Sequence, residues 1–116
     1  LDKLGLGAKL GLDVIIRQSF FHGHYALLDE NTYPRPDYWL SLLYKQIAGD
    51  EVLNVTVQCD QKSWVNHVRF YALCNKNGII YYGMNLTPEP IKISFPNDSE
   101  IVEYLFEPAD NNLQAK

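Results

Sequence analysis

Side chains that could bind a substrate cluster at residues 17–25, which read RQSFFHGHY. Arg17 and Gln18 could hydrogen-bond to sugar hydroxyls or to carboxylates, which Arg binds bidentately. Alternation along a strand would direct one of these two side chains to the inside of the fold and the other toward covering helices. Tyr25 could stack on a sugar ring or hydrogen-bond beside a nucleophile; ordinary packing with a satisfied hydroxyl is the alternative.

The same region offers no pair of catalytic carboxyl groups. A glycosidase of the usual kind needs two carboxyl groups that flank one bond, about 5–5.5 Å apart for retention or about 6.5–9.5 Å for inversion. Asp29 and Glu30 are neighbours in sequence, so we interpret them as solvated or capping loop residues. His22 and His24 have no third ligand at a recognisable spacing, so we predict loop histidines and no metal site. No phosphate-binding or dinucleotide-binding motif indicates a cofactor.

The elements around these residues form a simple order. Residues 14–16 read VII without polar alternation, which is typical of a strand covered on both faces in a parallel sheet. We predict a helix over about residues 2–12, a strand over 13–20, a loop over 22–36 and then a second helix. Such an order is that of a βα-barrel unit, in which the C-terminal ends of strands and the loops after them carry the chemistry.

Both predicted helices carry local signals. Gly5 and Gly7 each cost about 1 kcal/mol of helix propensity, so the first helix depends on its packing. The second helix has Pro36 as a candidate first residue or Asp37 as a candidate cap, and Gly49 as its natural stop. We interpret its aromatic residues as core rather than as a binding platform: Tyr38, Trp39 and Tyr44.

After Gly49 the pattern changes to short apolar runs separated by turn-forming residues. We predict five strands, whose apolar residues begin at Val52, Val68, Ile79, Ile91 and Ile101, with turns at 60–61, 75–78, 88–90 and 96–98. Short strands at this spacing are typical of an antiparallel sandwich, although five are few for one. The fold class is therefore α+β, with a boundary at 48–50 that divides the chain into residues 1–48 and 49–116. The pattern is lost in the tail from Pro108.

Two cysteines flank the first predicted hairpin, whose strands lie near residues 51–59 and 66–74. In that register Cys74 faces the start of the first strand and Cys59 lies near the turn. At ~3.3 Å per residue they are more than about 20 Å apart, which is beyond disulfide reach. Each is either a free thiol or pairs with a partner outside this chain.

Three N-x-S/T sequons begin at Asn54, Asn85 and Asn97, where chance would give about one. This excess favours a secreted glycoprotein, and coincidence in a turn-rich region is the alternative. The chain begins at Leu1 and its only methionine is Met84, so we expect a processed or partial chain. No signal peptide can be read, and no stretch approaches the roughly 18 apolar residues that span a bilayer.

Length and composition limit the number of domains and the classes of binding partner only broadly. The 116 residues are enough for one domain with a modest core, and 47% hydrophobic and 21% charged residues are ordinary for a globular protein. The net charge of −4 gives no argument for binding to nucleic acid or to anionic membranes.

Three stretches resemble the heparanase family: LDKLGL at residues 1–6, DVIIRQSFF at 13–21 and PDYWLSLLYK at 36–45. The resemblance is dense over residues 1–53 and then thins to scattered matches. It implies a retaining endo-β-glucuronidase that cleaves heparan sulfate and is built as a (β/α)8 barrel plus a β-sandwich. This chain would be the last helix–strand–helix of the barrel followed by the first sandwich strands.

The resemblance also implies roles for individual residues. Both catalytic glutamates of the family lie upstream of the segment that matches Leu1, so no catalytic residue is expected in this chain. Gln18 and Tyr25 correspond to substrate-cleft residues, and Gly23 to a weaker backbone contact. Cys74 matches a cysteine whose disulfide partner lies beyond this chain.

The parent protein is thus expected to be a secreted, extracellular-matrix or lysosomal hydrolase of glycosyl bonds. Its expected partners are heparan sulfate or a related glycosaminoglycan, the missing barrel and sandwich segments, and membranes reached peripherally through proteoglycans. One alternative is a non-hydrolytic heparanase-like homologue that binds heparan sulfate or a protein. Another is that the 116 residues act alone as a structural module.

Overall fold

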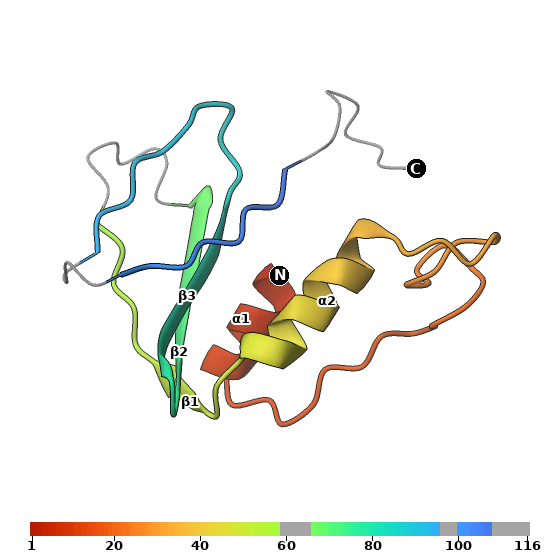
Figure 1. The fold of residues 1–116 in the computed structure, drawn as a ribbon, viewed down its shortest axis with the longest axis horizontal. Helices are drawn as coiled ribbons and strands as arrows, with labels where there is room; N and C mark the ends of the chain where they lie inside the picture. The colour runs from red at the N-terminus through yellow and green to blue at the C-terminus, as the bar shows by residue number, and fades with distance from the viewer. Residues whose placement is uncertain (59–65, 96–99, 108–116) are drawn as a thin grey trace.

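The computed structural model describes residues 1–58, 66–95 and 100–107 (Figure 1). Its elements are α1 (Asp2–Lys9), α2 (Pro36–Ile47), β1 (Glu51–Leu53), β2 (Val68–Asn75) and β3 (Gly78–Asn85). The three strands form one antiparallel sheet in the order β1-β2-β3. The chain is therefore a small α+β structure, as the sequence predicts.

Both helices pack on the same face of the sheet. Tyr71 on β2 and Tyr82 on β3 are directly paired, so their side chains share a face. Tyr71 lies against Gly5 of α1, while the ring of Tyr82 contacts the ring of Tyr44 of α2 at 5.5 Å between centroids. Figure 1 shows the two helices side by side next to the sheet.

The predicted dependence of the first helix on packing has a clear structural cause. Gly5 and Gly7 are its two buried residues. A Cβ atom at Gly5 would lie 2.3 Å from the Tyr71 ring, so only glycine allows the helix to approach the sheet this closely. The helix is shorter than predicted, because it ends at Lys9 and the chain turns through Gly11 with φ +73°.

The second helix begins as predicted, with Pro36 in its first turn after Arg35 in extended conformation. The helix ends at Ile47 with Ala48 as its C-cap, so Gly49 stands directly after the cap, the position in which a stop glycine is expected. Gly49 also lies against the backbone of Cys74, where a Cβ atom would come within 2.0 Å of the carbonyl oxygen. The core prediction for Trp39 is wrong, since this residue is 52% exposed.

The turn at 75–78 forms the predicted hairpin. Asn75 pairs with Gly78, which has φ +141°, and the Asn75 side chain accepts a hydrogen bond from the Asn77 amide at 2.8 Å. The Asn75 amide group also donates to the carbonyl of Ile47 at 3.0 Å, which ties the hairpin tip to the end of α2. The predicted register is confirmed at Cys74, which faces Glu51 at the start of β1.

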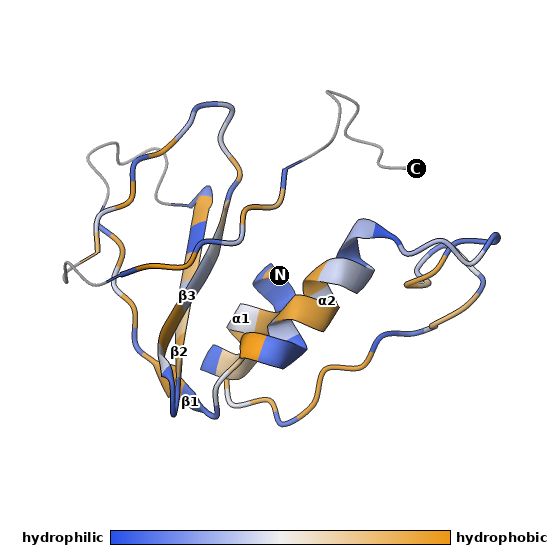
Figure 2. Ribbon diagram, in the orientation of Figure 1, coloured by the Kyte–Doolittle hydropathy of each residue, from blue (hydrophilic) through white to orange (hydrophobic). Residues whose placement is uncertain are grey.

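The strand predicted over residues 13–20 is not formed. Only an isolated parallel bridge between Ser19 and Ala26 lies there, and Val14 and Ile16 are 68% and 80% exposed. A parallel strand requires neighbouring strands to pair its backbone groups, and the described residues supply none to this stretch. Figure 2 shows hydrophobic residues along this unpaired stretch as well as along β2 and β3.

The prediction of five strands is also corrected. Residues 91–95 and 101–106 run without regular strand structure, and the first strand is limited to β1. The barrel and sandwich architectures are not confirmed by this arrangement. Cys59, Asn97, the turns at 60–61 and 96–98 and the tail from Pro108 lie outside the described residues.

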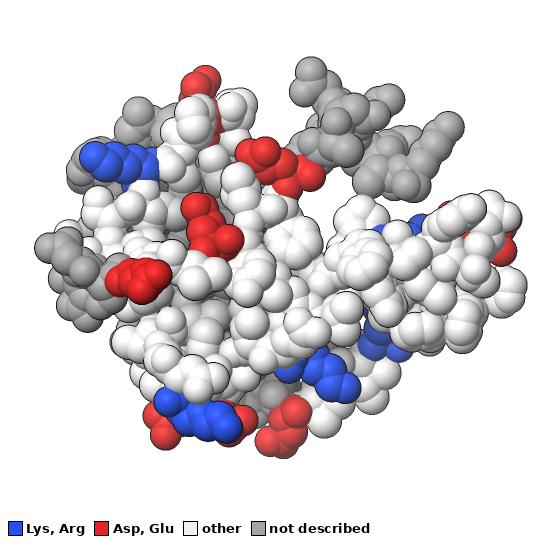
Figure 3. Space-filling view, viewed as in Figure 1, with Lys and Arg blue, Asp and Glu red and all other residues white. Residues whose placement is uncertain are grey.

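The core of the described part is small. Its buried hydrophobic residues are Ala26, Ala72 and Leu73, whereas many larger apolar side chains are exposed. In the space-filling view, acidic and basic side chains are scattered over a largely uncharged face (Figure 3). No helix among the described residues is long and apolar enough to cross a membrane.

Candidate substrate-binding loop

Two short segments meet at the candidate site. The bridge between Ser19 and Ala26 is parallel, so the residues before these two, Gln18 and Tyr25, occupy neighbouring positions on adjacent segments. Ala26 is fully buried, and the amide of Leu28 donates to the carbonyl of Phe20 at 3.1 Å. These contacts fix the base of residues 22–26, here called the Tyr25 loop.

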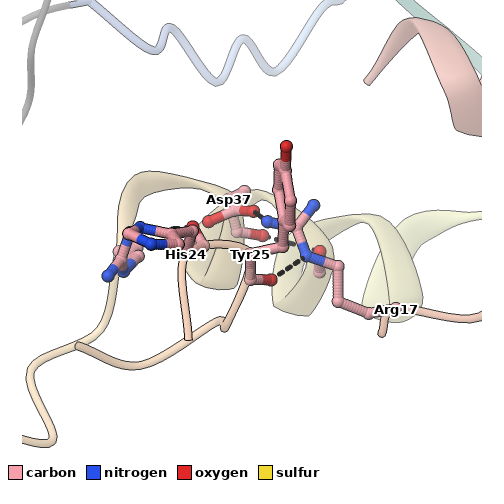
Figure 4. A network of polar contacts seen from close by, with 6 residues as sticks. Arg17, His24, Tyr25 and Asp37 are labelled. Carbon is pink, nitrogen blue, oxygen red and sulfur yellow. Dashed lines mark hydrogen bonds and ion pairs between the residues drawn. The ribbon is translucent and has the colours of Figure 1, made fainter. Parts of the chain in front are cut away.

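The structure gives Arg17 partners within the chain. Its Nε donates a hydrogen bond to the carbonyl oxygen of Tyr25 at 2.7 Å, and its guanidinium forms an ion pair with Asp37 in the first turn of α2 (Figure 4). Arg17 therefore faces α2 and is bonded to the loop, while its contact with a substrate stays a prediction. Gln18, the next residue, is exposed.

Tyr25 is 67% exposed and its phenol ring extends away from the Arg17–Asp37 pair (Figure 4). The alternative of ordinary packing does not hold for this side chain. The loop reaches Tyr25 through His22 and Gly23, whose φ angles are +56° and +87°. Both lie in the left-handed region, where glycine is unstrained and other residues are uncommon.

A second arginine supports the same loop. Arg35, the residue before α2, donates from Nη1 to the carbonyl oxygen of His24 at 3.4 Å, and its backbone amide donates to the carbonyl of Leu27 at 2.9 Å. The Nε atom of Arg35 is buried and has no hydrogen-bond partner among the described residues. Sequence reasoning missed Arg35, because neither its type nor its spacing indicates a contact with a loop eleven residues earlier.

The two acidic residues that follow the Tyr25 loop, Asp29 and Glu30, differ in their contacts. Asp29 Oδ1 accepts hydrogen bonds from the backbone amides of Asn31 and Tyr33, each at 2.9 Å, which confirms its interpretation as a capping residue. Glu30 is exposed. No group of three or more His, Cys, Asp and Glu side chains able to hold a metal occurs within the described ranges.

Cys74 and two of the sequons lie away from this loop. Cys74 is a half-buried free thiol in the described part of the chain. Asn54 is exposed, and Asn85 forms a compact turn in which its Oδ1 accepts from the Thr87 amide at 2.9 Å while its Nδ2 donates to the Glu89 carbonyl at 2.7 Å.

The most strongly perturbed side chains are two tyrosines between the helices and the sheet. Burial, and then a hydrogen bond to Asp2, raises the pKa of Tyr71 to about 12. Burial, and then the nearby hydroxyl of Tyr44, raises the pKa of Tyr82 well above its usual range. The Tyr82 hydroxyl is buried and makes no hydrogen bond of normal geometry with the residues that the structure describes. Both phenols stay protonated at neutral pH and serve packing rather than acid–base chemistry.

No family model matches the chain. It is 51% identical to heparanase of Rattus norvegicus over 75 residues, which are 64% of this chain and 13% of the relative. It is 37% identical to inactive heparanase-2 of Homo sapiens over 93% of this chain and 21% of the relative. It is 32% identical to hyaluronoglucuronidase of Hirudo nipponia over 100% of this chain and 26% of the relative.

These relatives support a glycosidase-like class of protein. The chain belongs to the heparanase-like family. It spans between 13% and 26% of the length of the three relatives named above.

Proposed function

We propose that the chain is a segment of a heparanase-like glycoside hydrolase that cleaves internal β-glucuronidic bonds of heparan sulfate by a retaining, two-carboxylate mechanism. In this proposal the segment supplies substrate-cleft residues, and both catalytic glutamates come from other parts of the protein. The observation that carries the proposal is the 51% identity to rat heparanase over 75 residues, a stretch that accounts for 64% of the chain.

The geometry of the Tyr25 loop supports this assignment. Gln18 and Tyr25 lie at neighbouring positions and are both exposed, so an amide and a phenol can meet the same ligand. Amides and phenols both donate and accept hydrogen bonds, as recognition of sugar hydroxyls requires. Gly23 is exposed with positive φ, which leaves its backbone accessible to a ligand.

The acidic residues near the Tyr25 loop support assigning the catalytic carboxyl groups to other parts of the protein. Asp29 accepts hydrogen bonds from two backbone amides through Oδ1, and we do not assign it as one of the two carboxyl groups that flank a scissile bond. In the proposed enzyme Tyr25 and Gln18 bind and orient the sugar, which lowers the barrier by holding the scissile bond against carboxylates supplied elsewhere.

The test is made in the full-length protein. Tyr25→Phe and Gln18→Ala are each expected to lower kcat/KM for heparan sulfate cleavage about threefold to tenfold, the usual effect of losing one hydrogen bond. Tyr33→Phe is the matched control, since Tyr33 is 69% exposed on the same chain segment and Tyr25 is 67% exposed. Unchanged kcat/KM in both cleft variants would contradict the cleft roles.

A second candidate function is a non-hydrolytic homologue that binds heparan sulfate or a protein partner. The 37% identity to inactive heparanase-2 over 93% of the chain supports it. Heparin affinity of the full-length protein without release of reducing ends would decide for this candidate. Release of new reducing ends from heparan sulfate would decide for the hydrolase.

The proposal extends to architecture and location. We propose that residues 1–48 complete a (β/α)8 barrel and that residues 49–116 begin a β-sandwich, each finished by segments outside this chain. The exposed apolar side chains of Val14 and Ile16 are consistent with such completion. We also propose glycosylation at Asn54, Asn85 and Asn97, a disulfide from Cys74 to a cysteine outside the chain, and a secreted or lysosomal location with proteoglycan-mediated attachment to membranes.

A further inference from the structure

Two guanidinium groups hold two consecutive carbonyl groups of the Tyr25 loop. Arg35 Nη1 donates to the carbonyl oxygen of His24 at 3.4 Å, and Arg17 Nε donates to that of Tyr25 at 2.7 Å. Arg17 precedes the Tyr25 loop in the sequence, and Arg35 follows it, just before α2. The backbone that carries the Tyr25 side chain is thus bonded from both directions.

The anchor of this arrangement is α2. Asp37, in the first turn of α2, forms an ion pair with Arg17, and the carbonyl of Asp37 accepts a hydrogen bond from Ser41 Oγ at 2.6 Å. Arg17 therefore links a helix to the loop, because one planar guanidinium can serve both a carboxylate and a carbonyl. The hydrogen bond of Arg17 to the loop is shorter than that of Arg35, so we expect it to be the stronger of the two.

We propose that Arg17 and Arg35 are positioning residues that hold the His24–Tyr25 backbone and so fix the direction in which the Tyr25 phenol meets the glycan. This inference rests on the proposed function, since it assigns to Tyr25 a contact with the substrate. In this proposal the two arginines act through their bonds to the loop and need no contact of their own with the substrate.

Folding stability alone does not account for the Arg17–Asp37 pair. The two side chains are 45% and 38% exposed, and ion pairs at such exposure contribute little to stability. Arg69 of β2 and Asp2 of α1 also form an ion pair, with side chains 39% and 41% exposed, away from the Tyr25 loop. Arg69→Met is therefore a matched control for Arg17→Met.

The decisive experiment is a double-mutant cycle in the full-length protein with Arg17→Met, Tyr25→Phe and the double variant, read out as kcat/KM on heparan sulfate. Each single change is expected to lower kcat/KM about threefold to tenfold, and the double change to lower it about as much as one single change rather than by the product of the two. Arg17→Lys is expected to lower kcat/KM as much as Arg17→Met does. The reason is that a lysine ammonium lacks the planar guanidinium group that bonds both Asp37 and the loop carbonyl. Arg35→Met is expected to have a smaller effect than Arg17→Met.

Three results would overturn the inference. One is multiplicative loss in the double variant, which would mean that Arg17 does not act through Tyr25. Another is loss of activity that follows a matching fall in the unfolding temperature. The third is an equal loss of kcat/KM in Arg69→Met.

The failure of the proposed function is distinguishable from these results. If the wild-type protein binds heparin without cleaving, the hydrolase proposal fails and the same cycle is read as heparin Kd, with the same non-additivity expected. If the wild-type protein neither cleaves nor binds, both proposals are wrong. If it cleaves and the cycle is multiplicative, only the positioning role is wrong.

Discussion

The hydroxyl of Tyr71 donates a hydrogen bond of 2.6 Å to the carboxylate of Asp2, a residue 69 positions earlier, and thereby joins β2 to α1. Tyr71 also stacks on Tyr82 at 5.5 Å, and Tyr82 contacts Tyr44 of α2 at 5.5 Å. A continuous row of aromatic rings therefore connects both helices to the sheet. Aromatic pairs of this kind contribute about 0.5–1.5 kcal/mol each beyond their burial.

Replacement of Tyr71 by Phe is expected to destabilise the protein by about 1–2 kcal/mol, because the hydrogen bond to a charged acceptor is lost while the ring contacts remain. The measurement is the urea midpoint of unfolding of the full-length protein. Tyr81→Phe is the control, since Tyr81 lies next to Tyr82 on the strand and faces the opposite side of the sheet. Equal midpoints for wild type and Tyr71→Phe would contradict a stabilising role for this bond.

The same contact predicts a loss of stability at alkaline pH. The pKa of Tyr71 is raised to about 12 in the folded protein, chiefly by burial, against an ordinary value of 10.0. Above pH 10 the unfolded state binds fewer protons at this group than the folded state, so its stabilising contribution is complete below pH 10 and is lost as the pH rises toward 12. The difference in stability between wild type and Tyr71→Phe should shrink over this window. A constant difference from pH 9 to pH 12 would show that the pKa is not raised.

Alanine at Gly5 is expected to destabilise the protein although it favours the helix. The gain in helix propensity is about 1 kcal/mol, whereas overpacking against the Tyr71 ring, 2.3 Å from the new Cβ atom, costs about 1–3 kcal/mol. Gly7→Ala is the matched comparison, because its Cβ would meet the flexible end of Ile15 at 2.5 Å. Gly5→Ala should have the lower unfolding temperature of the two, and the reverse order would contradict the close approach of α1 to the sheet.

Glycosylation at Asn85 is testable through Thr87. The Thr87 hydroxyl donates to Asn85 Oδ1 at 2.6 Å in the described turn, and the sequon requires Ser or Thr at this position. In protein secreted from eukaryotic cells, Thr87→Val should remove one enzymatically releasable glycan by mass, whereas Thr87→Ser should retain it. Thr56→Val tests Asn54 in the same way. An unchanged mass in Thr87→Val would mean that Asn85 carries no glycan.

Local signals in the sequence predicted α2 and the β2–β3 hairpin. The bounds of α2 follow from Pro36 and from its helical spacing, and the β2–β3 hairpin follows from turn residues that end in Gly78. The position of Cys74 opposite Glu51 followed from the same alternation of strands and turn. The helix and the β2–β3 hairpin depend on hydrogen bonds between residues close in sequence, so residue type and spacing are sufficient to predict them.

Only the tertiary structure decided whether residues 13–20 form a strand and which groups Arg17 bonds. An apolar run such as residues 14–16 becomes a strand only where neighbouring strands accept its backbone groups. Among the described residues the predicted strand has a single bridge, at Ser19, outside this run. Arg17 could be read from the sequence as a ligand for a sugar, but the fold brings Asp37 and the Tyr25 carbonyl to its guanidinium. The fold decides which of several possible partners such a side chain binds, because it sets the distances between the groups. Spacing along the sequence does not give these distances.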